Sequence, residues 1–193
     1  RWAFAGAAAL RLVARGTEAS LRGAVGEPTP ALLFVGSAQC DWDDPTCAHG
    51  KTLPEEMYVH AVEVYANGSM VGRPSLRTDV GGVPAWLTAA PAGGGWCLFV
   101  SRLDRSDVLG LGVGAGGKLL LPGSAALAGG ELPVFTAVAD GAGGGDVLVG
   151  ANYGTQSGPD NGASVAVFQV GPECGLRLQA DVRHRGGSGR VPG

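Results

Sequence analysis

The feature that most constrains the fold is an internal repeat with a period of about 50 residues, in the range of known repeat units. Residues 108–130 can be placed over residues 165–187 without a gap, and apolar and glycine positions then coincide. Both segments close on Gly-Gly, as does an earlier copy at residues 59–82. A chain with such a repeat uses one supersecondary unit several times.

The segments between these copies match as well. Residues 83–103 align with residues 132–153 after one insertion. The segment "LLFVGS" (32–37) aligns with "CLFVSR" (97–102) and is the earliest copy of this strand. Each unit therefore holds four short apolar runs, and none of them shows the 3.6-residue period of a helix.

Turn residues stand where hairpins require them, at Asn67-Gly68, Gly116-Gly117 and Gly175. Glycine is abundant, with 35 of 193 residues, and it clusters between the apolar runs. We interpret this as many tight turns rather than disorder.

Four strands per unit of about 40–50 residues are typical of a β-propeller blade. The sequence therefore predicts an all-β fold of four-stranded antiparallel blades, packed face to face. It holds almost three units, too few to close a ring of about four to eight blades.

We divide the chain into a partial propeller over residues 31–193 and an N-terminal extension over residues 1–30. The extension is rich in Ala and Arg and is interpreted as a transit-peptide remnant or a linker.

Composition excludes several partners. The formal net charge is −3 and Lys and Arg form no stripe, so we expect no nucleic acid. No run approaches 18 apolar residues, so we expect no membrane span. The four cysteines are too few to define a disulfide framework in a chain of this length, which favours a reducing compartment.

Three short motifs are weighed against simpler interpretations. "GVGAGGK" (112–118) contains two phosphate-binding patterns, but Pro122 follows too soon for the required helix and the repeat places the glycines in a turn. "CDWDDPTCAHGK" (40–51) matches no familiar metal spacing, so we expect an inserted loop with an optional Cys40–Cys47 link. Asn67-Gly68-Ser69 is a glycosylation sequon, but Asn-Gly is also what a type I′ hairpin turn requires.

The order of "FVGS" (34–37), "GANYG" (150–154), "SVAVFQV" (164–170) and "GGSG" (186–189) resembles the 6-phosphogluconolactonase-type family of seven-bladed propellers. That family also includes fungal carboxymuconate-lactonizing enzymes. The resemblance covers about residues 32–190. It implies that the chain is part of an incomplete seven-bladed propeller.

The chain departs from the family pattern at several positions. Phe135 stands where the family tends to have His, and Ser101-Arg102-Leu103 stands where it has Val-Asn-Glu. Arg185 takes the place of the His before Gly-Ser-Gly, with His184 one position early.

The resemblance implies hydrolysis of a sugar-acid lactone, most of all 6-phosphogluconolactone to 6-phosphogluconate in the pentose phosphate pathway. No cofactor or metal is expected. Lactone hydrolysis needs a base and positive groups for the oxyanion and the anionic tail. We expect His184 as the base, and Arg102, Asn152, Tyr153 and Arg185 as substrate-binding residues. We expect Asn152 to end the strand that lines the central channel.

The resemblance also implies where the remaining catalytic residues lie. The His and Arg residues implicated in the family fall mostly in later blades of the propeller. We therefore expect the main catalytic residues beyond Gly193, the last residue of this sequence.

Two alternatives remain open. The chain can be a non-catalytic propeller that serves as a binding scaffold, which the missing family His and Glu favour. It can also be a lactonizing isomerase of the same fold. His60 lies in an apolar strand pattern and is interpreted as structural. We expect a cytoplasmic protein, with the plastid as the alternative.

Overall fold

The computed structural model describes 7–8, 31–37, 58–92, 95–102, 105–127, 133–140, 146–152 and 164–183. Over these residues the chain is all-β: it forms three antiparallel sheets of four strands and two short 3₁₀ turns, and no α-helix. The expected all-β fold with four strands per unit is confirmed.

Each sheet takes four consecutive strands, and each strand pairs with the next along the chain. The first sheet contains β1 (Ala7–Ala8), β2 (Ala31–Ser37), β3 (Tyr58–Val64) and β4 (Met70–Asp79). The second contains β5 (Pro84–Ala92), β6 (Gly95–Arg102), β7 (Asp107–Val113) and β8 (Leu119–Leu127). The third contains β9 (Pro133–Asp140), β10 (Asp146–Asn152), β11 (Ser164–Val170) and β12 (Leu176–Arg183).

The edge strand β1 comes from the segment that we assigned to an N-terminal extension. Ala7 pairs with Val35 and Ala8 with Phe34, so this part of the extension belongs to the first sheet. The remaining residues of the extension lie outside the described part of the chain.

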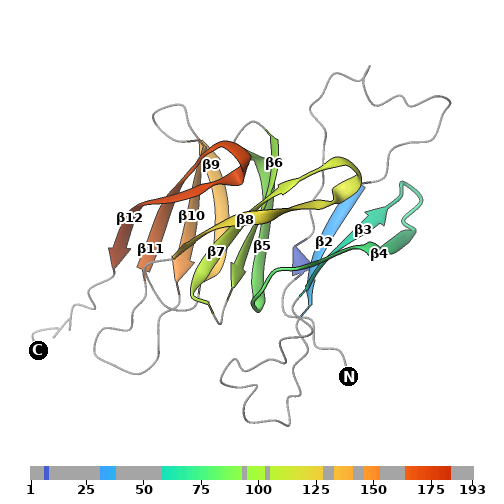
Figure 1. The fold of residues 1–193 in the computed structure, drawn as a ribbon, viewed down its shortest axis with the longest axis horizontal. Helices are drawn as coiled ribbons and strands as arrows, with labels where there is room; N and C mark the ends of the chain where they lie inside the picture. Colours follow the sequence, from blue (N-terminus) through green and yellow to red (C-terminus); the bar gives the residue numbers. More distant parts are fainter. Residues whose placement is uncertain are drawn as a thin grey trace, which may run out of the picture.

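The three sheets follow one another in chain order, from the sheet of β2 at the right of Figure 1 to the sheet of β12 at the left. The middle sheet buries both of its faces. Leu98 and Val100 of β6 pack in a core with Phe34 of the first sheet, while Cys97 and Phe99 pack in a second core with the third sheet. This alternation is what a strand requires when neighbours cover both sides of its sheet.

The hairpin turn between the third and fourth strands is closed by the same hydrogen bond in all three sheets. The N–H groups of Tyr65, Gly114 and Gly171 donate to carbonyls four residues later, at 2.9, 2.8 and 2.8 Å. The turn in the second sheet is the 3₁₀ turn η3 (Ala115–Gly117), and that in the third is η4 (Pro172–Cys174).

Two expectations about these turns can be judged directly. The glycine-rich segment 112–118 is a hairpin turn followed by β8, as the repeat indicated. The Asn67-Gly68 turn is present, but its type differs from the expected type I′. Only Gly68 has a positive φ, of 82°, and its N–H donates to Tyr65 O. This is a type I turn followed by a left-handed residue, the usual three-residue hairpin loop.

The turns of the second and third sheets each rest on the second strand of the preceding sheet. A Cβ atom on Gly117 would lie 2.8 Å from Leu32 Cδ1, so η3 contacts β2. In η4, Cys174 forms a disulfide with Cys97 of β6. The sequence repeat aligns Gly117 with Cys174 and Leu32 with Cys97, so both boundaries use the same contact.

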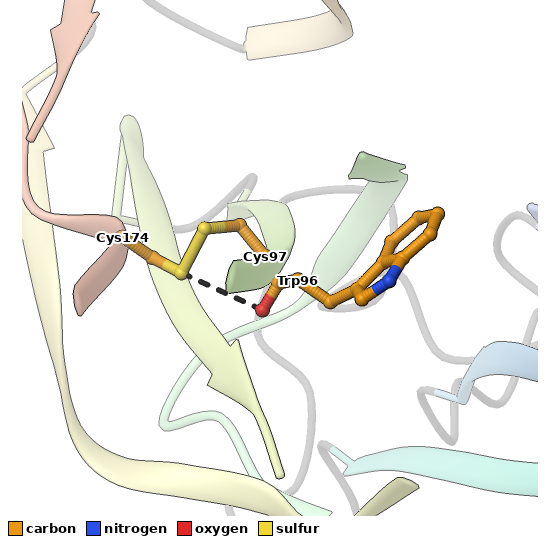
Figure 2. Close-up of a disulfide and its surroundings, with 3 residues drawn as sticks. All are labelled: Trp96, Cys97 and Cys174. Atoms are coloured by element: carbon orange, nitrogen blue, oxygen red, sulfur yellow. Dashed lines mark hydrogen bonds between the residues drawn. A yellow bond between two sulfur atoms is a disulfide. The ribbon is translucent and has the colours of Figure 1, made fainter. Parts of the chain in front are cut away.

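The disulfide Cys97–Cys174 corrects our expectation about cysteine usage. Closing a loop across a sequence separation of 77 residues removes conformations from the unfolded chain, which contributes about 2–4 kcal/mol to stability. Figure 2 shows the bond between β6 and η4, with the Trp96 ring directed away from it. Cys174 Sγ lies 3.7 Å from Trp96 O, but a sulfur in a disulfide carries no hydrogen, so this is a packing contact. The expected Cys40–Cys47 link lies outside the described residues.

Cys174 holds a backbone conformation that favours glycine. Its φ is 63° and that of Glu173 is 55°, whereas the matching residues of η3 are Gly116 and Gly117. A left-handed conformation costs a non-glycine residue about 1–2 kcal/mol. We infer that the disulfide offsets this cost by fixing Cys174 against β6.

Gly110 of β7 provides a direct test of this boundary. A Cβ at this position would lie 2.2 Å from Cys174 O, a backbone atom of a turn tied by the disulfide. We therefore expect Gly110→Ala to lower the free energy of unfolding by about 3 kcal/mol, through overpacking. Gly72→Ala is the matched control, because nothing lies within 4 Å of its Cβ position. Urea denaturation measures both, and equal stability of the two variants would contradict the close packing.

Candidate functional site

Polar residues mark the end of the second strand in all three sheets. Each last residue of a second strand pairs with the first residue of the third strand. The pairs are Ser37 with Tyr58, Arg102 with Asp107, and Asn152 with Ser164. The repeat therefore places a polar pair at the same position three times.

The first two of these strand ends lie close together. A Cβ on Gly36 would lie 3.1 Å from Pro84 Cβ, and Pro84 is the register partner of Arg102. The start of β5 thus stands between the ends of β2 and β6. The connection from β4 to β5 passes through the same region, since Asp79 pairs with Tyr58 and Asp79 Oδ1 accepts the N–H of Gly81 at 2.7 Å. We call the group Ser37, Tyr58, His60 and Arg77 the strand-end cluster.

Ser37 and His60 form a hydroxyl–imidazole pair. Ser37 Oγ lies 2.9 Å from His60 Nε2, and both side chains are half-buried. The two residues come from neighbouring strands, with His60 two positions beyond the register partner of Ser37. A hydroxyl within hydrogen-bond distance of an imidazole is the arrangement by which a base activates a nucleophile.

The surroundings of His60 keep the imidazole neutral. Burial lowers the pKa of His60 below its ordinary value, and the positive charge of Arg77 lowers this pKa further. Arg77 is the cross-strand register partner of His60. A neutral imidazole can accept a proton at neutral pH, which a general base requires.

Arg77 supplies a positive charge at the surface of the cluster. Its guanidinium carbon lies 3.3 Å from the centre of the Tyr58 ring, and the side chain is exposed. The ring centres of Tyr58 and His60 are 6.3 Å apart. An exposed guanidinium, stacked on an aromatic ring beside a neutral base, is suited to bind an anion.

Arg102, a predicted substrate-binding residue, makes three hydrogen bonds within the protein. Nε and Nη2 donate to the two carboxylate oxygens of Asp107, and Nη1 donates to Val80 O at 2.7 Å. The two side chains are 13% and 11% exposed. Since Val80 lies in the connection from β4, Arg102 joins the first and second sheets. Three of its five N–H donors are thus occupied before any ligand binds.

The other predicted site residues can be located only in part. Asn152 ends β10, and its backbone pairs with Ser164. Tyr153, His184 and Arg185 lie outside the described residues, so their roles stay predictions.

The main catalytic residues expected beyond Gly193 also stay a prediction. The sequence ends at Gly193, and the described residues end earlier, with Arg183 of β12. The described part contains a hydroxyl–imidazole pair in the first sheet, Ser37 and His60.

One element of the expected geometry is wrong. We expected Asn152 to end a strand that lines a channel, which requires a strand at the inner edge of its sheet. β10 lies between β9 and β11, and β6 lies between β5 and β7. Asn152 and Arg102 therefore end central strands of their sheets, not edge strands.

Most of the strand-end cluster was not predicted from the sequence. We interpreted His60 as structural and made no prediction for Ser37, Tyr58 or Arg77. One signal was present: the alignment of 32–37 with 97–102 places Ser37 over Arg102. The contact with His60 depends on the register between β2 and β3, and the long segment between these strands leaves that register undetermined by sequence.

Neither a metal site nor a membrane span is found in the described part of the chain. No three side chains of His, Cys, Asp or Glu gather there, and no helix has the length and apolar character needed to cross a bilayer. Searches of protein families, curated proteins and solved structures gave no match to the chain.

The lowered pKa of His60 predicts a pH dependence of stability. The unfolded chain binds a proton at this residue more readily than the folded one, so folding is favoured above about pH 6.5 and loses this contribution as the pH falls below it. We expect His60→Gln, which retains a hydrogen-bonding side chain, to reduce the loss of stability on going from about pH 7 to pH 5. Urea denaturation at several pH values measures it. Parallel pH profiles for the two proteins would contradict this prediction.

Proposed function

We propose that the chain is part of a β-propeller hydrolase that opens a sugar-acid lactone, with 6-phosphogluconolactone as the first substrate to test. The observation that carries this proposal is the Ser37–His60 pair, 2.9 Å apart, beside the exposed Arg77. The resemblance to the lactonase family supports the choice of substrate class.

The blade interpretation rests on the repeated contact between sheets. Consecutive four-stranded meanders stack by placing one hairpin turn on the second strand of the preceding sheet, and a radial array of blades needs such a repeated contact. The third sheet also carries two exposed apolar side chains on the face opposite Phe168, which a further blade would cover. They are Val165 and its register partner Val182. We propose seven blades in the complete ring, following the resemblance.

The proposed reaction uses Ser37 as the nucleophile and His60 as the base. Ser37 Oγ attacks the lactone carbonyl carbon, and His60 Nε2 takes the hydroxyl proton. The ring C–O bond then breaks, and the departing oxygen receives this proton from His60. Water hydrolyses the acyl-serine with His60 again as base, which returns both residues to their first state.

Arg77 is the proposed anion-binding residue. Lactones of sugar acids in this class carry a phosphate or carboxylate, which a guanidinium binds through charge-assisted hydrogen bonds. Arg102 suits this role less, because Asp107 and Val80 already accept three of its N–H groups. We therefore propose that Arg77 takes the role that the sequence analysis gave to Arg102.

A non-catalytic anion-binding propeller is the second candidate. The same exposed Arg77 favours it, because ligand binding needs the guanidinium but not the Ser37–His60 pair. The two functions differ in their response to substitution. If the chain is a scaffold, the wild type and the Ser37→Ala variant would both bind the ligand, and neither of them would hydrolyse it.

The proposal predicts a loss of kcat for two residues of the cluster and a rise in KM for a third. We expect Ser37→Ala and His60→Gln to lower kcat for 6-phosphogluconolactone by about 100-fold or more, because each removes a chemical step. Arg77→Ala should raise KM by about 10-fold or more, the value of one charged hydrogen bond. The assay subtracts spontaneous lactone opening. Arg177→Ala is the control, since Arg177 is an exposed residue that bonds to Gln169 on the third sheet.

A covalent probe tests whether the Ser37 hydroxyl is an activated nucleophile or an unreactive hydroxyl. A fluorophosphonate should label Ser37 in the wild type and label it much more slowly in His60→Gln, with the site read by peptide mass spectrometry. Full activity in folded Ser37→Ala would disprove the nucleophilic role. A folded wild-type protein that turns over no sugar-acid lactone would favour the scaffold.

A further inference from the structure

The turn between β3 and β4 carries the sequon Asn67-Gly68-Ser69 on an exposed hairpin tip. All three residues are exposed, and the turn is closed by Tyr65 N–H donating to Ser69 O at 2.9 Å. Asn67 Oδ1 accepts the N–H of Ser69, also at 2.9 Å. Because this bond uses the amide oxygen, Nδ2, the atom to which a sugar is attached, takes no part in it.

The internal repeat shows that this position stays exposed when a neighbouring sheet is present. The register of the three turns aligns Asn67 with Gly116 of η3 and Glu173 of η4. Both are exposed, although the next residues, Gly117 and Cys174, are buried against the preceding sheet. Nothing lies within 4 Å of a Cβ on Gly116. A group attached at Asn67 therefore stays clear of the stacking contact.

An independent observation indicates the compartment in which the chain folds. The Cys97–Cys174 disulfide joins two sheets through the buried core, where both cysteines are 3% exposed or less. Disulfides of this structural kind form and persist in oxidising compartments and are rare in the cytosol. The secretory pathway is the oxidising compartment in which Asn-x-Ser sequons are glycosylated.

We propose that Asn67 is an N-glycosylation site and that the chain folds in the secretory pathway, rather than in the cytosol or plastid. In the transfer step, Asn67 Nδ2 forms a bond to the anomeric carbon of a lipid-pyrophosphate-linked oligosaccharide. The bond from that carbon to the phosphate oxygen breaks, the lipid pyrophosphate leaves, and Nδ2 loses one proton. This inference does not depend on the proposed lactone chemistry.

The direct test is peptide mapping of the protein isolated from its own cells. Enzymatic deglycosylation in heavy-oxygen water converts a glycosylated Asn67 to a labelled Asp, and the non-reduced digest shows whether Cys97 and Cys174 are linked. We expect both products. An Asn67 peptide found only in its unmodified form would overturn the proposal, whatever the lactonase assay gives.

Variants directed to the secretory pathway of a eukaryotic host test the sequon itself. Wild type and Ser69→Thr should show a mobility shift that an endoglycosidase removes, and Ser69→Ala should show none. Asn67→Asp is the matched control, because its carboxylate can still accept the Ser69 N–H and keep the turn while it offers no amide nitrogen. A shift that persists in Asn67→Asp, or a wild type secreted without a glycan, would contradict the assignment.

Discussion

The contact on which the structure depends is the seating of a hairpin turn on the second strand of the preceding sheet. It occurs as Gly117 on Leu32 and again as Cys174 bonded to Cys97. A four-stranded meander cannot bury both faces alone, so each sheet needs a neighbour at a fixed distance. The turn sets this distance because its backbone approaches the strand closely. At the second boundary, the approach of Cys174 O leaves no space for a side chain on Gly110.

The same stacking places the strand-end cluster. When the second sheet packs on the first, the start of β5 comes against the end of β2, and Arg102 reaches back to Val80 O. The connection between the sheets is then held beside Ser37 and His60. Burial lowers the pKa of His60, and the charge of Arg77, its cross-strand partner, lowers this pKa further.

The all-β fold with four strands per sheet was predictable from the sequence, because the repeat, the turn glycines and the apolar runs all report local structure or its repetition. The three turns and the four strands per sheet follow from these signals. The strand-end cluster was not predicted, because it depends on contacts between distant residues. Ser37 and His60 meet through a strand register that no local pattern encodes, and Arg102 is occupied by Asp107 and a carbonyl of the preceding connection. The Cys97–Cys174 bond was likewise not predicted, because it joins residues 77 positions apart in the sequence.

The central claim is that the two sheet boundaries are equivalent, and a second cross-link tests it most directly. In a Leu32→Cys/Gly117→Cys variant, the new cysteines occupy the positions that match Cys97 and Cys174. Cys174 tolerates a φ of 63° in this turn, so Gly117, with a φ of 85°, should accept a cysteine once it is bonded. We predict a linked 32–117 peptide in the oxidised protein, together with a higher melting temperature than in its reduced form. Two unbonded thiols at 32 and 117, with Cys97–Cys174 intact, would show that the boundaries differ and that the repeat does not extend to the packing of the sheets.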